Sequence, residues 1–458
     1  MKTRFIYLFL ALSCSLCMAC KKNFLDQKPD KALAVPTTLD DFQAILDNSN
    51  TVMNISPVGS VFSTDDLYLS DAGYAAANAT QRNAYVWAKA IYPGADPVLD
   101  WNAPYQQVFY ANVVLDGLKA YQATASDQNR RDQIKGAALF FRAFAFYELA
   151  QLFAAPYVKG SAATTPGIPI RLEADVNLPT TRSTLEQTYA QILNDLQLAA
   201  SLLPVQTQYK TRPCQSAAFA LLARVALIMG DAAAAGKYAA SALSTKSSLI
   251  DYNGLDPLAT FPFPLVLPNN NDEVIFYSRM QTPYTLVNEV NGVVGELYHS
   301  YQANDLRKSL FFKTIGNGVY NFKGSYSGLN TLFSGLSTDE LYLIKAESEA
   351  RIGALDDALA DLNTLLVKRY ATETFVPVQA ATAEEALNLI LQERRKELVM
   401  RNLRWSDLRR LNLDPRFAKT LTRQVSGQSY TLKPNDPRYT FPIPLNVISL
   451  TGIPQNER

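Results

Sequence analysis

The chain has 458 residues, of which 48% are hydrophobic, and this supports a large core in one big domain or in two to three smaller ones. The net charge of +1 excludes the basic footprint of a nucleic-acid-binding protein. The one histidine, His299, cannot supply a two-histidine metal site, and we expect it in a loop rather than as a catalytic base. No phosphate-binding loop, HExxH helix, GxSxG elbow or dinucleotide turn occurs, so we expect no enzyme, cofactor or metal site.

The N-terminus has the pattern of a secretory signal peptide over residues 1–19. Two basic residues precede the apolar run 5–12, which is too short to anchor stably across a bilayer. Small residues follow, and Cys20 stands directly before two lysines. This is typical of a bacterial lipoprotein, in which cleavage leaves a lipid-bearing cysteine as the first mature residue. We therefore predict lipidation of Cys20, with 20–37 as the lipidated N-terminus and tether.

Alternatives to lipidation at Cys20 stay open. Cys14 or Cys17 could carry the lipid instead, or the chain could be an ordinary secreted protein or keep this segment as a membrane helix. The other cysteine, Cys214, stands alone, so an acylated Cys20 leaves no partner for a disulfide. We predict that Cys214 is a buried small hydrophobe rather than a nucleophile.

The region 38–245 is expected to be mainly helical. Apolar residues recur at three- and four-residue steps and predict helices over 105–122, 127–155, 183–203, 217–229 and 232–243. Ser183 is expected to cap the third of these, with Glu186 in the capping-box position. The segment 48–104 is rich in Gly, Pro, Asn and Tyr and is expected to be mostly loop, with ligand-binding residues.

A repeat becomes visible at Gly230-Asp231, where one helix ends and an alanine-rich helix follows. This resembles a tetratricopeptide unit, and the pattern returns over 338–366. One such unit cannot bury its apolar face alone, so several must stack. We predict a mostly α fold: a TPR-like helical-repeat (α-α superhelix) scaffold. Residues 246–336 break the period and are expected to form a loop-rich insertion with a few short strands, before a C-terminal region of further helices over 337–458.

The segment 383–411 carries a dense set of charges around Trp405. One interpretation is a salt-bridged amphipathic helix, and the other is an anion or sugar site built from arginine and tryptophan. We favour the first, because Glu393, Glu397 and Asp407 offer local partners for the arginines.

Two motifs in this segment, ERRKEL (393–398) and RWSDLRR (404–410), resemble the signature of the SusD/RagB family of Bacteroidetes outer-membrane lipoproteins. Further stretches agree in order and spacing, so that the resemblance spans nearly the whole chain: CKKNFLDQKP (20–29), FRAFAFYEL (141–149), GIP (167–169), YTFPIP (439–444) and PQN (454–456). The chain departs from the family pattern at Met400-Arg401-Asn402 and at 154–157.

The resemblance implies a lipid-anchored protein at the outer face of the outer membrane, acting as a lid on a SusC-like TonB-dependent transporter. It implies capture of an oligosaccharide or, in some members, a peptide, and no catalysis. A TPR-like scaffold without a small ligand, on the periplasmic face, remains the alternative from another class.

A sugar site needs exposed aromatic faces among short polar side chains. The sequence offers such residues in 48–104 and in 246–336, and we predict ligand contacts from Asp65, Asp66, Tyr74, Arg82, Asn83, Trp87, Tyr284, Tyr298 and Tyr320. In sugar-binding members of the family an acid, an arginine and a tryptophan contact ligand at about the position of Asp65 or Asp66, Arg82 and Trp87. The alternative is that many of these rings fill the non-repeat side of the scaffold. Asp100-Trp101-Asn102 is expected to cap a core helix instead.

Overall fold

The computed structural model describes residues 36–458 except 269 and 317. The predicted signal peptide, the lipidation of Cys20 and nearly all of the tether lie outside the described residues. The chain divides into two compact units, 1–38 and 39–458. The described residues of the first form no helix or strand. In the second, helices dominate over a few short strands, which confirms the predicted mostly α class.

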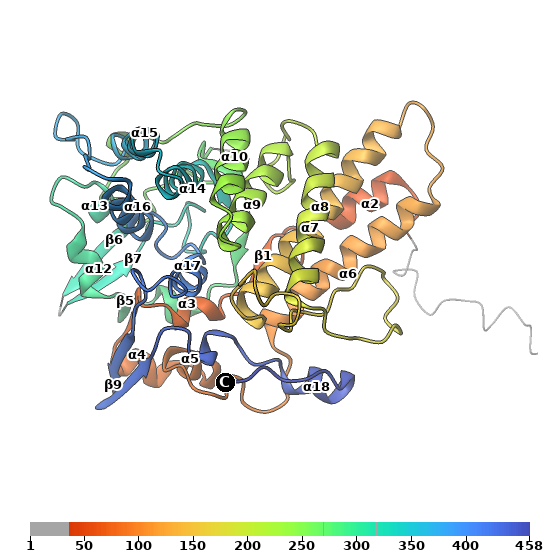
Figure 1. The fold of residues 1–458 in the computed structure, drawn as a ribbon, viewed down its shortest axis with the longest axis horizontal. Helices are drawn as coiled ribbons and strands as arrows, with labels where there is room; N and C mark the ends of the chain where they lie inside the picture. Colours follow the sequence, from red (N-terminus) through yellow and green to blue (C-terminus); the bar gives the residue numbers. More distant parts are fainter. Residues whose placement is uncertain (1–35, 269, 317) are drawn as a thin grey trace, which may run out of the picture. The chain divides into compact units, whose positions relative to one another are not determined.

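The scaffold of the second unit is a series of helices in which each packs against the next in chain order (Figure 1). Its members are α6 (Leu99–Ala120), α7 (Gln128–Phe153), α8 (Leu185–Leu202), α9 (Gln215–Ile228), α10 (Ala232–Leu243), α14 (Thr338–Arg351), α15 (Leu355–Leu366) and α16 (Ala383–Glu397). The short helix α2 (Leu39–Leu46) packs on α6 and α7 and buries Phe42. Stacking of this kind is how helical repeats bury faces that no single pair could cover.

The two predicted repeat units contact each other directly although the 246–336 segment separates them in sequence. Helix α10 packs against α14, where a Cβ added to Gly236 would lie 3.1 Å from the Ser348 Cβ. The turn between α9 and α10 has Gly230 at a φ of +77°, a left-handed conformation that favours glycine at a helix C-terminus. Asp231 then caps α10 by accepting from the Ala234 N–H at 3.0 Å. The small residues read from the sequence thus permit close helix approach.

Several helix ends differ from the prediction. Helix α8 is capped by Thr184 with Gln187, not by Ser183 with Glu186. Thr184 Oγ1 accepts from the Gln187 N–H at 3.1 Å, and Gln187 Oε1 accepts from the Thr184 N–H at 3.0 Å. The segment 383–411 is not one helix. Residues Met400 and Asn402 have φ values of +58° and +62°, and this bend separates α16 from α17 (Arg404–Leu411).

The segment 48–104 contains more regular structure than expected. It includes β1 (Ile55–Ser56), α3 (Gly59–Ser63), β2 (Leu67–Leu69), α4 (Asp71–Ala76), α5 (Ala79–Tyr85) and the first turns of α6. Helix α6 begins at Leu99 rather than at 105, so Asp100 and Trp101 belong to its first turn. The Trp101 ring packs edge-on against Phe153 of α7, with centroids 4.9 Å apart, so this turn is held against the scaffold.

The 246–336 segment contains a few short strands, as expected, together with short helices that were not predicted, and it pairs with the segment 48–104. Strand β1 runs parallel to β4 (Arg279–Met280), and β2 is the first strand of a four-stranded sheet in the order β2-β5-β7-β6. The other elements of these regions are β3 (Val274–Phe276), α11 (Tyr284–Val287), β5 (Asn291–Val293), α12 (Gly295–Ser300), α13 (Arg307–Phe311), β6 (Phe312–Gly316), β7 (Val319–Phe322) and β8 (Leu336–Ser337). The two loop-rich segments therefore build one structure beside the helices.

The end of the chain adds a hairpin and one more helix: β9 (Leu421–Val425), β10 (Gln428–Leu432) and α18 (Leu445–Thr451). In Figure 1 β9 lies on the same side of the molecule as α4 and α5. Contacts link them, since Arg423 of β9 donates to the carbonyl oxygens of Phe62, Thr64 and Tyr85.

The charged C-terminal segment forms a buried ion-pair network, as the first interpretation predicts, but the network spans two helices and includes arginines from outside the segment. Glu397 accepts from Arg307 Nη1 at 3.0 Å and from Arg369 Nε at 2.8 Å, and all three side chains are fully buried. Arg394 Nε pairs with Asp407 at 2.9 Å. Trp405 is buried and stacks on Tyr439 with centroids 4.8 Å apart. The carboxylates Glu397 and Asp407 thus have arginine partners, although Arg394 Nη1 and Trp405 Nε1 have no partner among the described residues.

Candidate functional site

The predicted acids Asp65 and Asp66 are occupied by ion pairs with the C-terminal region. Asp65 accepts from Arg404 Nε at 2.7 Å, and Asp66 accepts from Arg395 Nε at 2.8 Å. Burial alone would raise the pKa of Asp65, but Arg404, Arg395 and Lys419 hold this pKa well below its ordinary value. The two carboxylates join the loop segment to the C-terminal helices, and their charges are already balanced.

Trp87 lies in the core and offers no open face to a sugar ring. Its side chain is 2% exposed, and Nε1 donates to the Ser63 carbonyl oxygen at 2.9 Å. The Arg423 guanidinium covers the ring, with its carbon 4.6 Å from the centroid. This placement corrects the expectation of an exposed platform at Trp87. The position follows α5 with a φ of +54°, which turns the chain inward.

The other predicted residues of this segment hold the local backbone. Arg82 donates to the Ala77 carbonyl oxygen, and Asn83 Nδ2 donates to the Ile91 carbonyl oxygen at 3.1 Å. Tyr74 is half-buried against Tyr85, with ring centroids 5.9 Å apart. The structure therefore does not bring Asp65, Trp87 and Arg82 together around an open cavity.

The predicted tyrosines of the second segment behave differently. Tyr298 and Tyr320 are half-buried and stack face to face, with centroids 3.7 Å apart and planes 10° apart. His299, in helix α12 rather than in a loop, is 3.1 Å from the Tyr320 hydroxyl through Nε2. Tyr284 begins α11, and its side chain lies outside the described part of the chain.

Tyr298 lines a cavity of about 1010 Å³ in the 246–336 segment. Phe261, Phe312 and Phe322 contribute rings to its wall, and Lys308, Lys313 and Lys323 contribute amines. Each of these amines already has a partner: Lys308 donates to the Tyr301 carbonyl oxygen, Lys313 pairs with Glu289, and Lys323 donates to the Pro257 carbonyl oxygen. None of the buried side-chain atoms that lack a hydrogen-bond partner in the described chain belongs to the wall of this cavity.

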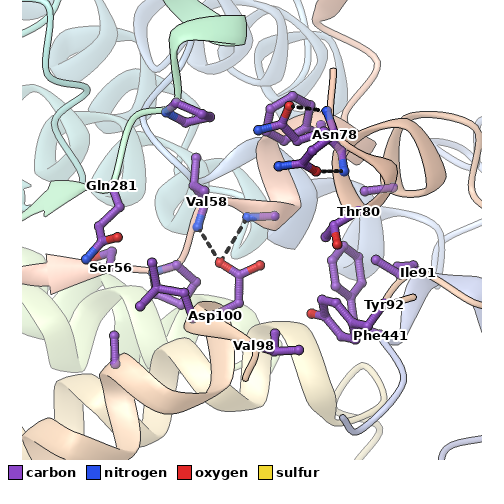
Figure 2. A pocket seen from close by; sticks show the side chains of 18 of the residues that line it. Ser56, Val58, Asn78, Thr80, Ile91, Tyr92, Val98, Asp100, Gln281 and Phe441 are labelled. Atoms are coloured by element: carbon purple, nitrogen blue, oxygen red, sulfur yellow. Dashed lines mark hydrogen bonds between the residues drawn. The ribbon is translucent and has the colours of Figure 1, made fainter. Parts of the chain in front are cut away.

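A second cavity, of about 650 Å³, lies where three distant segments meet. Its wall comes from 55–62, from 78–103 and from 279–283, with Phe441 from the C-terminal region. Figure 2 shows Val58 and Asp100 on one side of this cavity and Thr80, Ile91, Tyr92 and Phe441 on the other. We call it the Asp100 cavity.

The carboxylate of Asp100 has one satisfied oxygen and one open oxygen. Oδ1 accepts from the Val58 N–H at 2.9 Å and from the Gly59 N–H at 3.3 Å, drawn as dashed lines in Figure 2. Among the described residues nothing donates to Oδ2, and no lysine or arginine forms an ion pair with Asp100. Burial raises the pKa of Asp100 above its ordinary value, and the two backbone donors offset part of that effect.

The hydroxyl of Tyr92 is a second unsatisfied group in the same wall. The side chain is 8% exposed, and within the described chain its hydroxyl has no hydrogen-bond partner. Burial raises the pKa of Tyr92 well above its ordinary value, and the charge of Asp100 raises it further, while Arg458 opposes this. Buried polar groups are nearly always paired, so an unpaired hydroxyl in a cavity wall indicates a place for a ligand or water.

The sequence places Tyr92 in the segment 48–104 without marking it as a ligand contact, and it predicts Asp100 as part of a helix cap. The Asp100 carboxylate is indeed in the first turn of α6, yet it bonds the backbone of 58–59. A local signal existed only for Tyr92, since nothing near Asp100 in the sequence indicates that residues 58 and 59 come beside it.

The carboxylates Glu273, Asp339 and Glu397 form a cluster whose oxygens lie within 4.8 Å of one another. Arg369 bonds Glu273 and Glu397, each at 2.8 Å, and Arg401 bonds Asp339 at 3.2 Å. The positive charge that a metal would supply is therefore already present, and these residues do not fit a cation site.

Among the described helices none has the length and apolar content to span a bilayer.

Comparison with known proteins identifies relatives at both ends of the chain. Residues 23–227 match a family model described as starch-binding and associating with the outer membrane, and residues 338–456 match the model of the SusD family. The SusD-like protein P2 of Formosa agariphila is 24% identical over 355 residues, which are 63% of this chain and 66% of that protein.

Solved structures share the fold over nearly their whole length. A SusD superfamily protein of Bacteroides thetaiotaomicron has a TM-score of 0.73 at 22% identity, covering 92% of this chain and 100% of that one. A structure described as a putative sugar binding protein of Bacteroides vulgatus has a TM-score of 0.72 at 18% identity, covering 92% and 99%. Since the two family models match the first and last parts of one scaffold that these structures share, the chain belongs to the SusD/RagB family.

Proposed function

We propose that this chain is a cell-surface, lipid-anchored outer-membrane protein that captures oligosaccharide nutrients and delivers them to a SusC-like TonB-dependent transporter, over which it acts as a lid. Family membership supports the proposal, since the model matched by 23–227 is described as starch-binding and associated with the outer membrane. The description of the Bacteroides vulgatus neighbour as a putative sugar binding protein agrees with it.

The observation that carries the proposal is the Asp100 cavity. Its volume of about 650 Å³ is in the range of small-ligand sites. Its wall combines apolar surface from prolines and Phe441 with an open carboxylate oxygen and the unpaired Tyr92 hydroxyl. Saccharides offer both C–H faces and hydroxyl groups, which this combination can contact. The stacked Tyr298 and Tyr320 form a second candidate contact surface.

The direct test is a glycan array followed by calorimetry on the purified mature chain. We expect at least one oligosaccharide to bind, and we expect Tyr92→Phe to weaken that binding about tenfold, because it removes one hydroxyl from a buried contact. Tyr209→Phe is the matched control, since Tyr209 is exposed and lines neither cavity. Absence of binding to any saccharide, with tight binding of peptides, would replace the sugar with the peptide alternative.

The anchor and the transporter need separate experiments. We expect Cys20→Ala to release the protein from the membrane fraction, while Cys14→Ala leaves it there. Wild-type protein labelled by a membrane-impermeant reagent on intact cells would support the outward orientation. We expect a TonB-dependent transporter to co-purify with it from detergent-solubilised outer membranes, and failure to do so would leave a ligand-binding protein without the lid role.

A purely scaffolding role predicts a different outcome in cells. If the protein only bridges other proteins, variants of Asp100 and Tyr92 will leave growth on every carbon source unchanged. Under the proposed function, at least one polysaccharide will support slower growth of these variants. Measurable cleavage of a polysaccharide by the purified protein alone would contradict a binding role.

A further inference from the structure

The open oxygen of Asp100 is a hydrogen-bond acceptor that has no donor and no cationic partner among the described residues. Carboxylates as buried as Asp100, which is 8% exposed, normally have a cationic partner, and elsewhere in this chain Glu340, Glu397 and Asp195 all have one. Asp100 has only the two backbone N–H groups, both on Oδ1. The structure thus leaves half of this carboxylate available on the wall of the cavity.

The neighbouring charges do not compensate for it. Arg279 lines the same cavity, but its Nη2 donates to the Asn50 carbonyl oxygen at 2.8 Å. Arg458 influences Tyr92 electrostatically, yet it is not part of the wall, and its Nη2 donates to the Ala88 carbonyl oxygen at 2.9 Å. Asp96, which is exposed on the same wall, adds a second negative charge. Glu148, on α7, is a further buried acid whose charge interacts with that of Asp100.

The backbone near Asp100 leaves room for this arrangement. A Cβ on Gly59 would lie 2.3 Å from Oδ2 and 3.1 Å from the Phe441 ring, so only glycine permits the carboxylate to sit here. Oδ2 is then a hydrogen-bond acceptor in the wall of a small cavity. An ammonium group has three donors and one positive charge, so it can donate to Oδ2 and balance the charge of the carboxylate.

We propose that the Asp100 cavity binds a ligand that carries a protonated amine, with the amine on Asp100 Oδ2. This rests on the proposed function and names the chemical class of the ligand: an oligosaccharide of amino sugars with free amines, or a peptide with a free N-terminus. The two sources share the same chemistry, and the arms of the experiment distinguish them. A neutral hydroxyl can donate to the carboxylate but brings no charge to balance it.

The experiment is calorimetry at neutral pH with matched probes. Glucosamine oligomers are compared with N-acetylglucosamine oligomers of the same length, and a triglycine with a free N-terminus is compared with its N-acetylated form. A neutral glucose oligomer of the same length is the fifth probe. We expect one of the two amine-bearing probes to bind at least tenfold more tightly than its acetylated partner.

The variant Asp100→Asn tests the residue itself. Its amide oxygen can still accept from the N–H groups of 58 and 59, so we expect the protein to fold, with an unchanged or higher thermal midpoint. The tenfold preference for the amine should disappear, while binding of neutral probes stays within threefold. Asp356→Asn, which changes an exposed acid of α15 outside the cavity wall, is the matched control and should keep the preference.

The outcomes separate the two proposals. Equal binding of amine and acetylated probes, or an undiminished preference in Asp100→Asn, overturns the amine inference and leaves a sugar-capturing function intact. A preference seen only with the peptide supports the amine inference and removes the sugar. Binding of no probe in any form overturns the amine inference, and the glycan array then decides the proposed function separately.

Discussion

The Gly59 N–H donates to Asp100 Oδ1 at 3.3 Å, and the Gly59 Cα faces the other oxygen so closely that a Cβ would lie 2.3 Å from Oδ2. The turn at β1–α3 and the first turn of α6 are therefore built around one carboxylate. Such a contact ties the wall of the cavity to a single backbone position.

The first prediction concerns Gly59→Ala. The added methyl must displace the carboxylate or the Phe441 ring, so we expect ligand affinity to fall about tenfold while the fold persists. Calorimetry with the best probe and thermal unfolding measure the two effects. Gly160→Ala is the control, because a Cβ there meets no atom within 4 Å. Unchanged affinity in Gly59→Ala would show that Asp100 does not contact ligand.

The second prediction concerns the pH dependence of stability through Glu148. Burial raises the pKa of Glu148 to about 8, from the 4.5 of a free side chain, although Arg224 opposes this and Asp100 adds to it. A carboxyl whose pKa is higher in the folded state stabilises the fold at pH values below its unfolded pKa, and this stabilisation is lost as the pH rises toward 8. As the pH rises from 4.5 to about 8, we expect the ionisation of Glu148 to lower the free energy of unfolding by roughly a few kcal/mol.

Glu148→Gln isolates this contribution, because the amide can keep a hydrogen bond with Asn402, whose Nδ2 donates to Glu148 at 3.2 Å. The measurement is denaturant unfolding at pH 5 and pH 8 for both proteins. We expect the variant to gain stability relative to the wild type at the higher pH. Parallel profiles for the two proteins would show that Glu148 ionises normally.

The third prediction concerns Trp87→Phe. The variant loses ring area in the core and leaves the Ser63 carbonyl oxygen without its donor, so we expect a destabilisation of about 1 to 3 kcal/mol. Because Trp87 is buried, saccharide affinity measured well below the unfolding midpoint should not change. A loss of saccharide affinity with unchanged stability would instead show that Trp87 contacts the ligand.

The fourth prediction concerns the charge network. Glu397→Gln removes a carboxylate that Arg307 and Arg369 share, and we expect a loss of about 1 to 3 kcal/mol, because each buried guanidinium loses one of its carboxylate partners. Glu289→Gln is the control: its pair with Lys313 is exposed, and exposed pairs contribute about 0 to 1 kcal/mol. Urea unfolding compares the two, and similar losses in both variants would contradict the role of the buried network.

Much of the scaffold could be predicted because helix signals are local. The period of apolar residues and the Gly230-Asp231 turn predicted α9 and α10 to within two residues, and burial of Cys214 was also confirmed. The errors at Thr184 and Met400 arise where neighbouring residues compete for the same cap, or where a bend depends on packing. These choices differ by small local energies that tertiary contacts decide.

The sequence by itself determined the helical repeats, the family motifs and the lack of the catalytic sequence motifs named above, since each depends on residue type and short spacing. Only the tertiary structure decided which polar and aromatic side chains remain open. Asp65 and Trp87 had the right chemistry for a ligand, but Arg404 and Arg423, more than 300 residues later, occupy them. Nothing in the sequence marks Asp100 as a ligand contact, yet one of its carboxylate oxygens is unpaired in a cavity that the segments 55–62, 78–103 and 279–283 form together. Burial and charge balance depend on neighbours in space, and those are set by packing between segments that lie far apart in the chain.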